Sequence, residues 1–160
     1  MVQMVSFIIP AWNEEAILGQ TLTALEQAAR ILPMAHETIV VDDASTDGTP
    51  RIARERGAVV LTVNFRQMAA TRNAGAKVAR GDVLVFVDAD TLVNESVVTA
   101  AVQAVRDGAV GGSCLVLFDG VLPYWAKLLV PLSHGFRRVS RLAAGCFFFC
   151  ERTAHPRVPP

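Results

Sequence analysis

The sequence has no net charge and lacks any block of basic residues. Lysine and arginine number 15, and aspartate and glutamate number 15, among 160 residues. A neutral chain creates no positive field that attracts a polyanion, so we expect no nucleic-acid partner. The motif G-x-G-x-x-G is also missing after the first predicted strand, where Pro10-Ala11-Trp12-Asn13 stands instead. This excludes a dinucleotide-dependent dehydrogenase of the Rossmann type.

A secretion signal and a membrane-spanning run are absent as well. Residues 1–10 have no basic region followed by a long apolar core, and their apolar part, residues 5–9, has only the length of a strand. The most hydrophobic later stretch, residues 121–132, is interrupted by Pro123, Lys127 and Pro131. It is shorter than the roughly 20 residues that a span needs. We therefore expect a cytoplasmic protein, for which peripheral contact with the inner face of the membrane stays open.

Cysteine is scarce, with only Cys114, Cys146 and Cys150 in the chain. Their number is odd, no C-x-x-C spacing occurs, and their neighbours are apolar. Cysteine in such surroundings behaves as a small hydrophobic residue. We expect reduced thiols with a structural role.

The apolar content is sufficient for one folded domain. Hydrophobic residues make up 52% of the chain and charged residues 19%. A chain of this length buries roughly two-thirds of its unfolded surface when it folds. No internal repeat or linker is visible, so we expect residues 1–160 to form a single domain.

Strand patterns alternate with helix patterns along the chain. Short β-branched apolar segments have the length and composition of buried strands, and segments with helical spacing or many alanines separate them. This alternation predicts an α/β fold, a three-layer sandwich in which helices flank an open, mostly parallel sheet. The predicted strands are residues 5–10, 38–41, 58–63, 83–87, 113–118 and 142–150, and the predicted helices are residues 13–32, 50–56, 67–80, 94–107 and 121–139.

Local signals predict several element ends. Pro10 should stop the first strand because it has no N–H for the ladder. Asn13 should cap the first helix, with Glu14 in the turn where the helix dipole favours negative charge. Asn94 should cap the predicted helix 94–107, and Gly57 should end the predicted helix 50–56.

The most apolar predicted strand, residues 83–87, ends in Asp88-Ala89-Asp90. It fits a central strand buried on both faces, as parallel sheets require. Because side chains alternate along a strand, Asp88 and Asp90 leave it on one side if the extended conformation persists. Two carboxylates at the carboxyl end of a strand suit Mg²⁺ or Mn²⁺ shared with a phosphate. The alternative is a helix cap and a turn residue after a core strand.

Polar clusters follow two other predicted strands. The carboxyl ends of parallel strands meet along one edge of a sheet, so the three clusters should converge. Acidic groups repel a diphosphate unless a divalent cation and an arginine neutralise them, and Arg72 is the candidate arginine. Alternatively, Arg72 forms a surface ion pair worth at most about 1 kcal/mol. The candidate residues at the strand ends are Pro10, Ala11, Trp12, Asn13 and Glu14; Asp42, Asp43 and Ser45; and Asp88 and Asp90.

Two of these residues have side chains suited to a nucleobase. Trp12 offers a flat face for stacking, and Asp43 offers an acceptor for a pyrimidine imide N–H. Ordinary core packing of Trp12 and helix capping by Asp42 or Asp43 are the structural alternatives. Joint occurrence of such residues at successive strand ends favours a binding site.

Four segments match one known family in order and spacing. They are Pro10-Ala11-Trp12-Asn13-Glu14-Glu15, residues 39–49, Ala70-Thr71-Arg72-Asn73-Ala74-Gly75 and Phe86-Val87-Asp88-Ala89-Asp90-Thr91. They resemble the nucleotide-sugar half of family-2 glycosyltransferases with the GT-A fold, over residues 5–118. The resemblance implies that Pro10, Trp12 and Glu14 line the nucleotide pocket and that Asp43, beside Asp42, contacts the base. It also implies that Arg72 lies near the phosphates and that Asp88 and Asp90 contact the ribose and the metal. The other residues that it assigns to the donor site are Ala11, Asn13, Ser45, Asn73, Gly75 and Ala89.

The resemblance also implies an activity. Such enzymes transfer a sugar from a nucleoside diphosphate to a hydroxyl of a lipid or saccharide acceptor, with inversion and with a divalent metal. For this chain we expect UDP as the nucleotide and Mg²⁺ or Mn²⁺ as the metal. The family's acceptor half brings a Gly-Gly-Phe-Asp-like segment that helps supply the base, whereas this sequence ends in residues 151–160 without it. No catalytic base is therefore assigned, and Glu151 and His155 are weak candidates.

Two other functions stay open at this point. The missing carboxyl half favours a nucleotide-sugar-binding remnant or subunit without turnover of its own. Asp88-Ala89-Asp90-Thr91 also has the Asp-x-Asp-x-Thr form of aspartate-based phosphatases, but it falls in mid-chain and no acid pair follows it. The glycosyltransferase interpretation explains more of the sequence than either.

Overall fold

The computed structural model describes residues 2–114 and 145–155. Within them a six-stranded sheet has the order β3-β2-β1-β4-β6-β5. The elements are β1 (Met4–Ala11), α1 (Leu18–Ala29), β2 (Ala35–Asp43), α2 (Thr49–Glu55), β3 (Val59–Val63), α3 (Met68–Val78), β4 (Val83–Val87), α4 (Glu95–Arg106), β5 (Gly111–Ser113), β6 (Phe147–Glu151) and the short 3₁₀ helix η1 (Arg152–Ala154).

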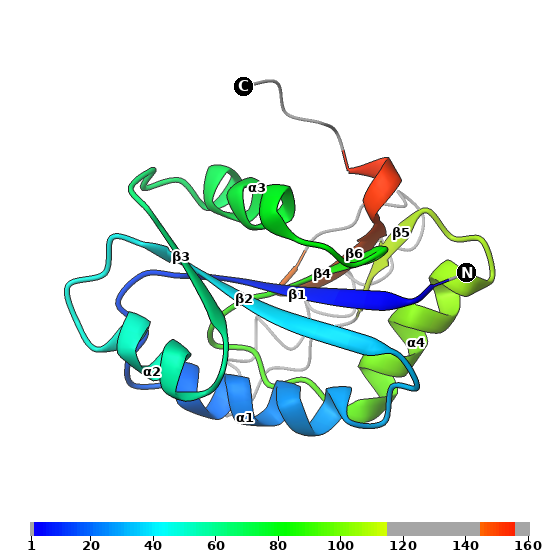
Figure 1. Ribbon diagram of the computed structural model, residues 1–160, viewed down its shortest axis with the longest axis horizontal. Coiled ribbons are helices and arrows are strands. Elements are labelled where there is room, and N and C mark those ends of the chain that lie inside the picture. Colours follow the sequence, from blue (N-terminus) through cyan, green and yellow to red (C-terminus); the bar gives the residue numbers. More distant parts are fainter. Residues whose placement is uncertain (1, 115–144, 156–160) are drawn as a thin grey trace, which may run out of the picture.

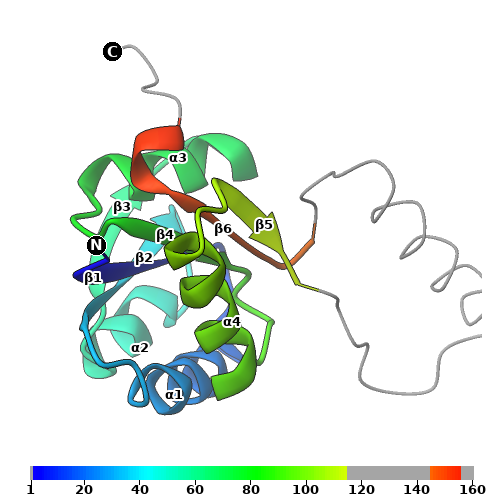
Figure 2. The ribbon, with the colours of Figure 1, turned by 90° about the vertical axis from the view of Figure 1, so that its right-hand side faces the viewer.

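The sheet is parallel on one side and antiparallel on the other. Strands β3, β2, β1 and β4 run parallel, whereas β6 is antiparallel to both β4 and β5. Helices α1, α2 and α4 cover one face and α3 covers the other (Figure 1). Figure 2 shows the same three layers from the side, with η1 next to α3. This arrangement confirms the predicted α/β sandwich with a mostly parallel sheet.

Alternating side chains of the central strands supply two hydrophobic cores. Val83, Val85 and Val87 of β4 pack in the core under α1 and α4, whereas Leu84 and Phe86 pack in the core under α3. All five side chains are at most 2% exposed. Burial on both faces explains why this strand is apolar throughout, as its sequence predicts.

The predicted end of the first strand and the predicted start of the first helix are wrong. Strand β1 continues through Pro10, which pairs with Val41, to Ala11. Pairing of β1 with β4 has already ended at Ile8, so Pro10 disturbs no ladder on that side. Helix α1 begins only at Leu18, and Asn13 is no N-cap, because its backbone has a φ of +56° and lies in a loop.

Other predicted boundaries are confirmed. Asn94 caps α4, since its Oδ1 accepts the Val97 N–H at 3.0 Å, and α2 ends before Gly57, whose φ is +75°. Strand β2, in contrast, is longer than the predicted strand 38–41 at both ends.

The carboxyl-terminal third differs from its prediction where the structure describes it. Strand β5 begins at Gly111, two residues before the predicted strand 113–118, and β6 begins within the predicted strand 142–150, at Phe147. Residues 115–118 of the one predicted strand, 142–144 of the other, and the predicted helix 121–139 lie outside the described residues. Of the helices that are described, none is both long and apolar enough to cross a membrane.

All three cysteines are free thiols, as predicted. Each is half-buried at the β5–β6 side of the molecule. Burial raises the pKa of the Cys114 and Cys150 thiols. Thiols of this kind stay protonated and unreactive at neutral pH.

Candidate functional site

The carboxyl ends of β1, β2 and β4 lie next to one another. Ala11 is paired with Asp42, and Ile8 is paired with Phe86. Continuing the second register by two residues puts Asp88 level with Pro10. The sequence prediction that these three strand ends converge is therefore met by the backbone.

Side chains of the loops after β1 and β2 hold these loops together. The Asn13 N–H donates to Ser45 Oγ at 2.9 Å, and Asn13 Oδ1 accepts the Thr46 N–H at 2.8 Å. The Glu14 N–H donates to Thr49 Oγ1 at 2.8 Å. Hydrogen bonds of Asn13 with Ser45 and Thr46 thus hold the loop after β1 against the loop after β2 at the edge of the site.

Asp42 and Asp43 have different roles at the end of β2. Asp42 Oδ1 accepts the Ser45 N–H at 3.2 Å and closes a turn. Asp43 is 6% exposed, and its two oxygens accept the Phe65 N–H at 2.6 Å and the Thr71 hydroxyl at 3.0 Å. Neither caps α2, whose N-cap is Gly48. The capping alternative is therefore wrong.

The carboxyl of Asp43 is held in its charged form. Burial alone would raise the pKa of Asp43, but hydrogen bonds from the backbone of Arg66, Phe65 and Gln67 and from the Thr71 hydroxyl lower it below its usual value. Donors that favour the ionised form outweigh desolvation here. At neutral pH, Asp43 is an acceptor at the edge of the sheet.

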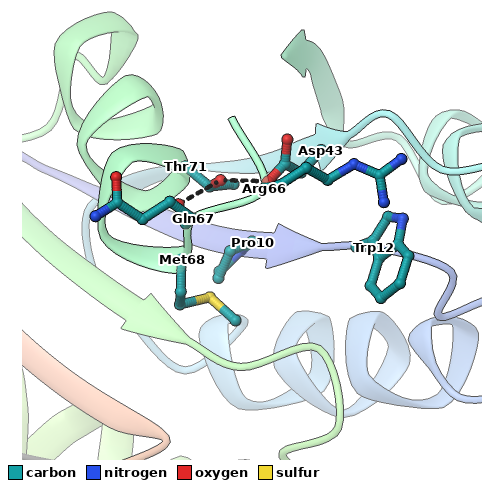
Figure 3. A pocket seen from close by; sticks show the side chains of 7 residues that line it. All are labelled: Pro10, Trp12, Asp43, Arg66, Gln67, Met68 and Thr71. Carbon is teal, nitrogen blue, oxygen red and sulfur yellow. Dashed lines mark hydrogen bonds between the residues drawn. The ribbon is translucent and has the colours of Figure 1, made fainter. Parts of the chain in front are cut away.

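A pocket of about 420 Å³ lies over this edge. Trp12 forms one wall, with its side chain about half exposed, and the Arg66 guanidinium lies 4.9 Å from the centre of the Trp12 ring. Figure 3 shows Gln67 and Met68 at the end of the pocket away from Trp12, with Thr71 and Asp43 between them and the Trp12 ring. The full lining is Pro10, Trp12, Asp43, Arg66, Gln67, Met68 and Thr71.

Arg72 connects α3 to the end of β4. Its guanidinium forms an ion pair with Asp88, as the sequence interpretation allowed, and lies 5.2 Å from the centre of the Phe148 ring. Arg72 Nε is buried and has no hydrogen-bond partner among the described residues. Since the preceding residue, Thr71, reaches Asp43, one turn of α3 serves two strand ends.

The chain turns directly after β4, so the extended conformation does not persist through Asp90. The Thr91 N–H donates to the Asp88 carbonyl at 3.0 Å. Ala89 is buried, and its carbonyl accepts the Thr21 hydroxyl at 2.7 Å. Asp88 is half-buried and Asp90 is exposed. The positions of Asp88 and Asp90 are therefore set by a turn that is hydrogen-bonded to α1. The alternation of side chains along an extended strand does not continue to Asp90.

Glu14 faces this turn. Burial raises the pKa of Glu14, and the negative charges of Asp90 and Asp47 raise it further. The carboxylates of Glu14, Asp47 and Asp90 are therefore close enough to repel one another at this edge. Such a concentration of negative charge is favourable for a cationic ligand.

The carboxylates fit a cation that is shared with a ligand. Among the described residues, no group of three His, Cys, Asp or Glu side chains can hold a metal. Asp88 and Asp90 supply hard oxygen donors from one turn, and Arg72 already neutralises part of the charge of Asp88. Mg²⁺ is commonly bound through one or two carboxylates together with phosphate oxygens, which is the donor set available here.

Several predicted site residues do not reach the pocket. Gly75 does not line the pocket and packs against the sheet, where a Cβ would lie 2.5 Å from Ile8 Cγ2. Ala11 and Ala89 are buried in the core under α1. Asn73 is half-buried on α3 and does not line the pocket.

The two other candidates for a catalytic base lie in different places. Glu151 pairs with Val83, at the amino end of β4, whereas Asp88 follows its carboxyl end, so Glu151 is not brought to the acidic turn. The His155 ring stacks on Phe86 of β4, with 6.0 Å between the ring centroids. That contact gives His155 no catalytic role.

Sequence reasoning missed four pocket residues, Arg66, Gln67, Met68 and Thr71. They belong to the loop after β3 and the first turn of α3. The signal was available, because β3 is a fourth parallel strand and its carboxyl end must lie on the same edge.

Comparisons of the sequence with known proteins agree on one family. Residues 6–154 match the family described as Glycosyl transferase family 2. The chain is 33% identical over 115 residues to an undecaprenyl-phosphate 4-deoxy-4-formamido-L-arabinose transferase from Aeromonas hydrophila, a match that covers 67% of this chain and 35% of the relative. The chain thus spans about a third of the length of that relative.

Two solved structures are similar in fold. S. aureus TarS 1–349 in complex with UDP-GlcNAc has a TM-score of 0.61 and 27% identity, covering 76% of this chain and 37% of that one. Mannosyl-3-phosphoglycerate synthase from Rubrobacter xylanophilus has a TM-score of 0.72 at 22% identity, covering 94% of this chain and 54% of that one. The sheet, the helices and the family match agree, and the chain belongs to glycosyl transferase family 2 and has the GT-A fold.

Proposed function

We propose that this chain binds a nucleoside diphosphate sugar and, as a whole protein, transfers the sugar to an acceptor with inversion. The observation that supports this most is the position of two adjacent α3 residues. Thr71 contacts Asp43 in the pocket, and Arg72 contacts Asp88 beside it. A ligand with a base at one end and a diphosphate at the other matches that pair of sites.

The base would be a uracil. Trp12 has an exposed ring for stacking, and ionised Asp43 accepts an N–H, which the imide of uracil supplies and which cytosine lacks at that position. The TarS structure, from a protein 27% identical to this chain, contains UDP-GlcNAc. We therefore propose UDP as the nucleotide of the donor.

The diphosphate would be held by Arg72 and by a divalent cation, Mg²⁺ or Mn²⁺, on Asp88 and Asp90. Arginine provides a fork of N–H donors for phosphate oxygens. The cation, when bound, would stabilise the negative charge of the leaving diphosphate. Glu14 adds negative potential next to Asp90 and so favours the cation.

The acceptor would be a hydroxyl-bearing or lipid-linked molecule. The Aeromonas relative is named for undecaprenyl phosphate, a lipid carrier. A lipid-linked acceptor requires contact with a membrane surface, and we propose peripheral association at its inner, cytoplasmic face. No catalytic base is proposed, because no described residue at the acidic turn carries an observation that singles it out.

A donor-binding module without turnover is the second candidate. It rests on the same pocket and acidic turn, which account for donor binding without requiring turnover. The phosphatase interpretation has no such support and is set aside with the family match.

Thermal unfolding with ligands tests both candidates. UDP with Mg²⁺ should raise the melting temperature, and a ligand at 100 times its Kd stabilises by about 2.7 kcal/mol. Pyrophosphate at the same concentration is the control for the contribution of the phosphates alone. Release of UDP from a donor panel in the presence of a lipid acceptor identifies the enzyme. Stabilisation without turnover indicates the binding module, and absence of stabilisation by UDP or any other nucleotide contradicts both.

A further inference from the structure

Arg66 has an unusual position at the mouth of the pocket. It lies in the loop between β3 and α3, and its backbone has a φ of +52°, in the left-handed region that non-glycine residues rarely adopt. The side chain is exposed at the surface, yet its guanidinium lies over the Trp12 ring at 4.9 Å. The backbone conformation therefore directs a charged side chain onto the aromatic wall.

The backbone of Arg66 is held in place by Asp43. Backbone N–H groups of Arg66 and Phe65 contribute to the lowered pKa of Asp43, and the Phe65 N–H donates to Asp43 Oδ1 at 2.6 Å. Hydrogen bonds to a buried, charged carboxylate offset the cost of a left-handed residue. The position of the loop is thus determined by the same residue that we propose as the base acceptor.

The charge of Arg66 has no carboxylate partner among the described residues. The ion pairs of the described chain involve Arg30, Arg51, Arg72 and Arg80. The interaction of Arg66 that the structure does define is with the ring face of Trp12. A cation on an exposed aromatic ring gains roughly 0.5–1 kcal/mol, so its displacement by a ligand is inexpensive.

We propose that Arg66 is a specificity-determining residue that makes the pocket select nucleoside diphosphates over nucleosides. The proposal rests on the function proposed above. In the free protein the guanidinium lies over the Trp12 ring, and both side chains line the pocket, so a base that stacks on Trp12 from the pocket has to displace it. A nucleoside gives the displaced cation no new partner, whereas a diphosphate does. Arg66 therefore weakens nucleoside binding and strengthens diphosphate binding.

The proposal predicts effects of opposite sign for two ligands. In Arg66→Ala, uridine should bind about 2–5-fold more tightly, which is the factor that corresponds to loss of an exposed cation–π contact. UDP with Mg²⁺ should bind about 5–10-fold more weakly, because a charge-assisted contact is lost. Isothermal titration calorimetry measures both. Arg30→Ala, which removes the same charge from an exposed ion pair at the end of α1, should change neither.

Three further variants keep the result interpretable. Arg66→Gly removes the side chain and the left-handed strain together, and it should show the same opposite changes as Arg66→Ala. Arg66→Lys retains the charge and should keep UDP affinity within about 2-fold, since ammonium also pairs with phosphate. In a Trp12→Leu background, Arg66→Ala should no longer tighten uridine binding, because the two effects act through one contact.

The outcomes separate this inference from the proposed function. If wild type binds UDP and Arg66→Ala weakens uridine binding, or leaves both affinities at wild-type values, the role of Arg66 is refuted while the donor site stands. If wild type binds neither UDP nor any other nucleoside diphosphate, the proposed function fails, and this inference fails with it.

Discussion

Arg72 in α3 and Asp88 at the end of β4 form an ion pair in which the side chains are 22% and 28% exposed. This contact fixes the helix that covers one face of the sheet to the turn that carries the acidic residues. Arg72 Nε is buried and unpaired among the described residues. A buried donor without a partner costs about 1–3 kcal/mol, so a ligand oxygen that reached it would bind favourably.

Replacement of Arg72 by lysine should weaken the binding of UDP about tenfold. Lysine keeps the charge but lacks the planar fork that contacts a carboxylate and a phosphate together, and tenfold corresponds to about 1.4 kcal/mol. Calorimetric titration with UDP and Mg²⁺ measures the change. Arg80→Lys is the matched control, because Arg80 pairs with Glu37 near the amino ends of the strands. Equal UDP affinity in Arg72→Lys and wild type would limit Arg72 to a structural ion pair.

Glu14→Gln should stabilise the free protein at neutral pH. Burial, Asp90 and Asp47 raise the pKa of Glu14, so the folded state holds its proton more tightly than the unfolded state does. This contribution to stability is present below the unfolded pKa, near 4.3, and is lost as the pH rises through the higher folded pKa. Removal of the charge should add about 0.5 kcal/mol to the free energy of unfolding at pH 7, a typical surface effect, and nothing at pH 3.

Urea denaturation at the two pH values measures the Glu14 effect. Glu26→Gln, at an exposed residue of α1 that pairs with Arg30, is the control and should give no gain at pH 7. A gain in Glu14→Gln that is equal at both pH values would show that side-chain polarity, and not charge, is responsible.

Asp43→Asn should destabilise the protein most at neutral pH. The pKa of Asp43 is lowered in the folded state by hydrogen bonds that outweigh its burial. Its contribution is therefore present above the unfolded pKa, near 3.9, and is lost as the pH falls through the folded pKa. We expect a loss of about 1–3 kcal/mol at pH 7, because an amide nitrogen would face a backbone donor.

The check on Asp43 is the shape of the stability curve against pH. The wild-type curve should fall in the acid range more steeply than the curve of Asp43→Asn, and Asp107→Asn, at an exposed residue beyond α4, should follow wild type. Parallel acid limbs for wild type and Asp43→Asn would contradict the lowered pKa.

The sequence is sufficient to predict where the site lies but not how its side chains are directed. Val83–Val87 had to be a buried strand, so Asp88 had to emerge at the edge where β1 and β2 also end. That inference uses only hydrophobicity and the rule for parallel strands. It needs no knowledge of loop conformation, which is why it succeeded.

Loop and helix orientation depended on contacts between distant residues. Asparagine is a common N-cap residue, but Asn13 instead forms hydrogen bonds with Ser45 and Thr46 and adopts a left-handed backbone conformation in a loop. Arg66 carries no local signal for stacking on Trp12, because that contact joins two loops that are distant in the sequence. Tertiary contacts decide such positions over local propensity.

Gly75→Ala should destabilise the protein although alanine favours helices by about 1 kcal/mol over glycine. A Cβ at this position would lie 2.5 Å from Ile8 Cγ2 and 2.8 Å from Val41 Cγ2, so α3 would have to move away from the sheet. Overpacking of this kind costs about 1–3 kcal/mol. Because α3 carries Thr71 and Arg72, the folded variant should also bind UDP more weakly.

Gly19→Ala in α1 is the matched control for that substitution. The nearest atom to its Cβ would be Ile52 Cγ2 at 3.6 Å, an ordinary contact. The variant should gain up to about 1 kcal/mol from helix propensity and bind UDP as wild type does. Denaturation and UDP titration of the two variants give opposite signs of stability if α3 is closely packed on β1 and β2. Stabilisation of both variants to a similar extent would mean that α3 can move away from the sheet at little cost, and that its position does not determine UDP affinity.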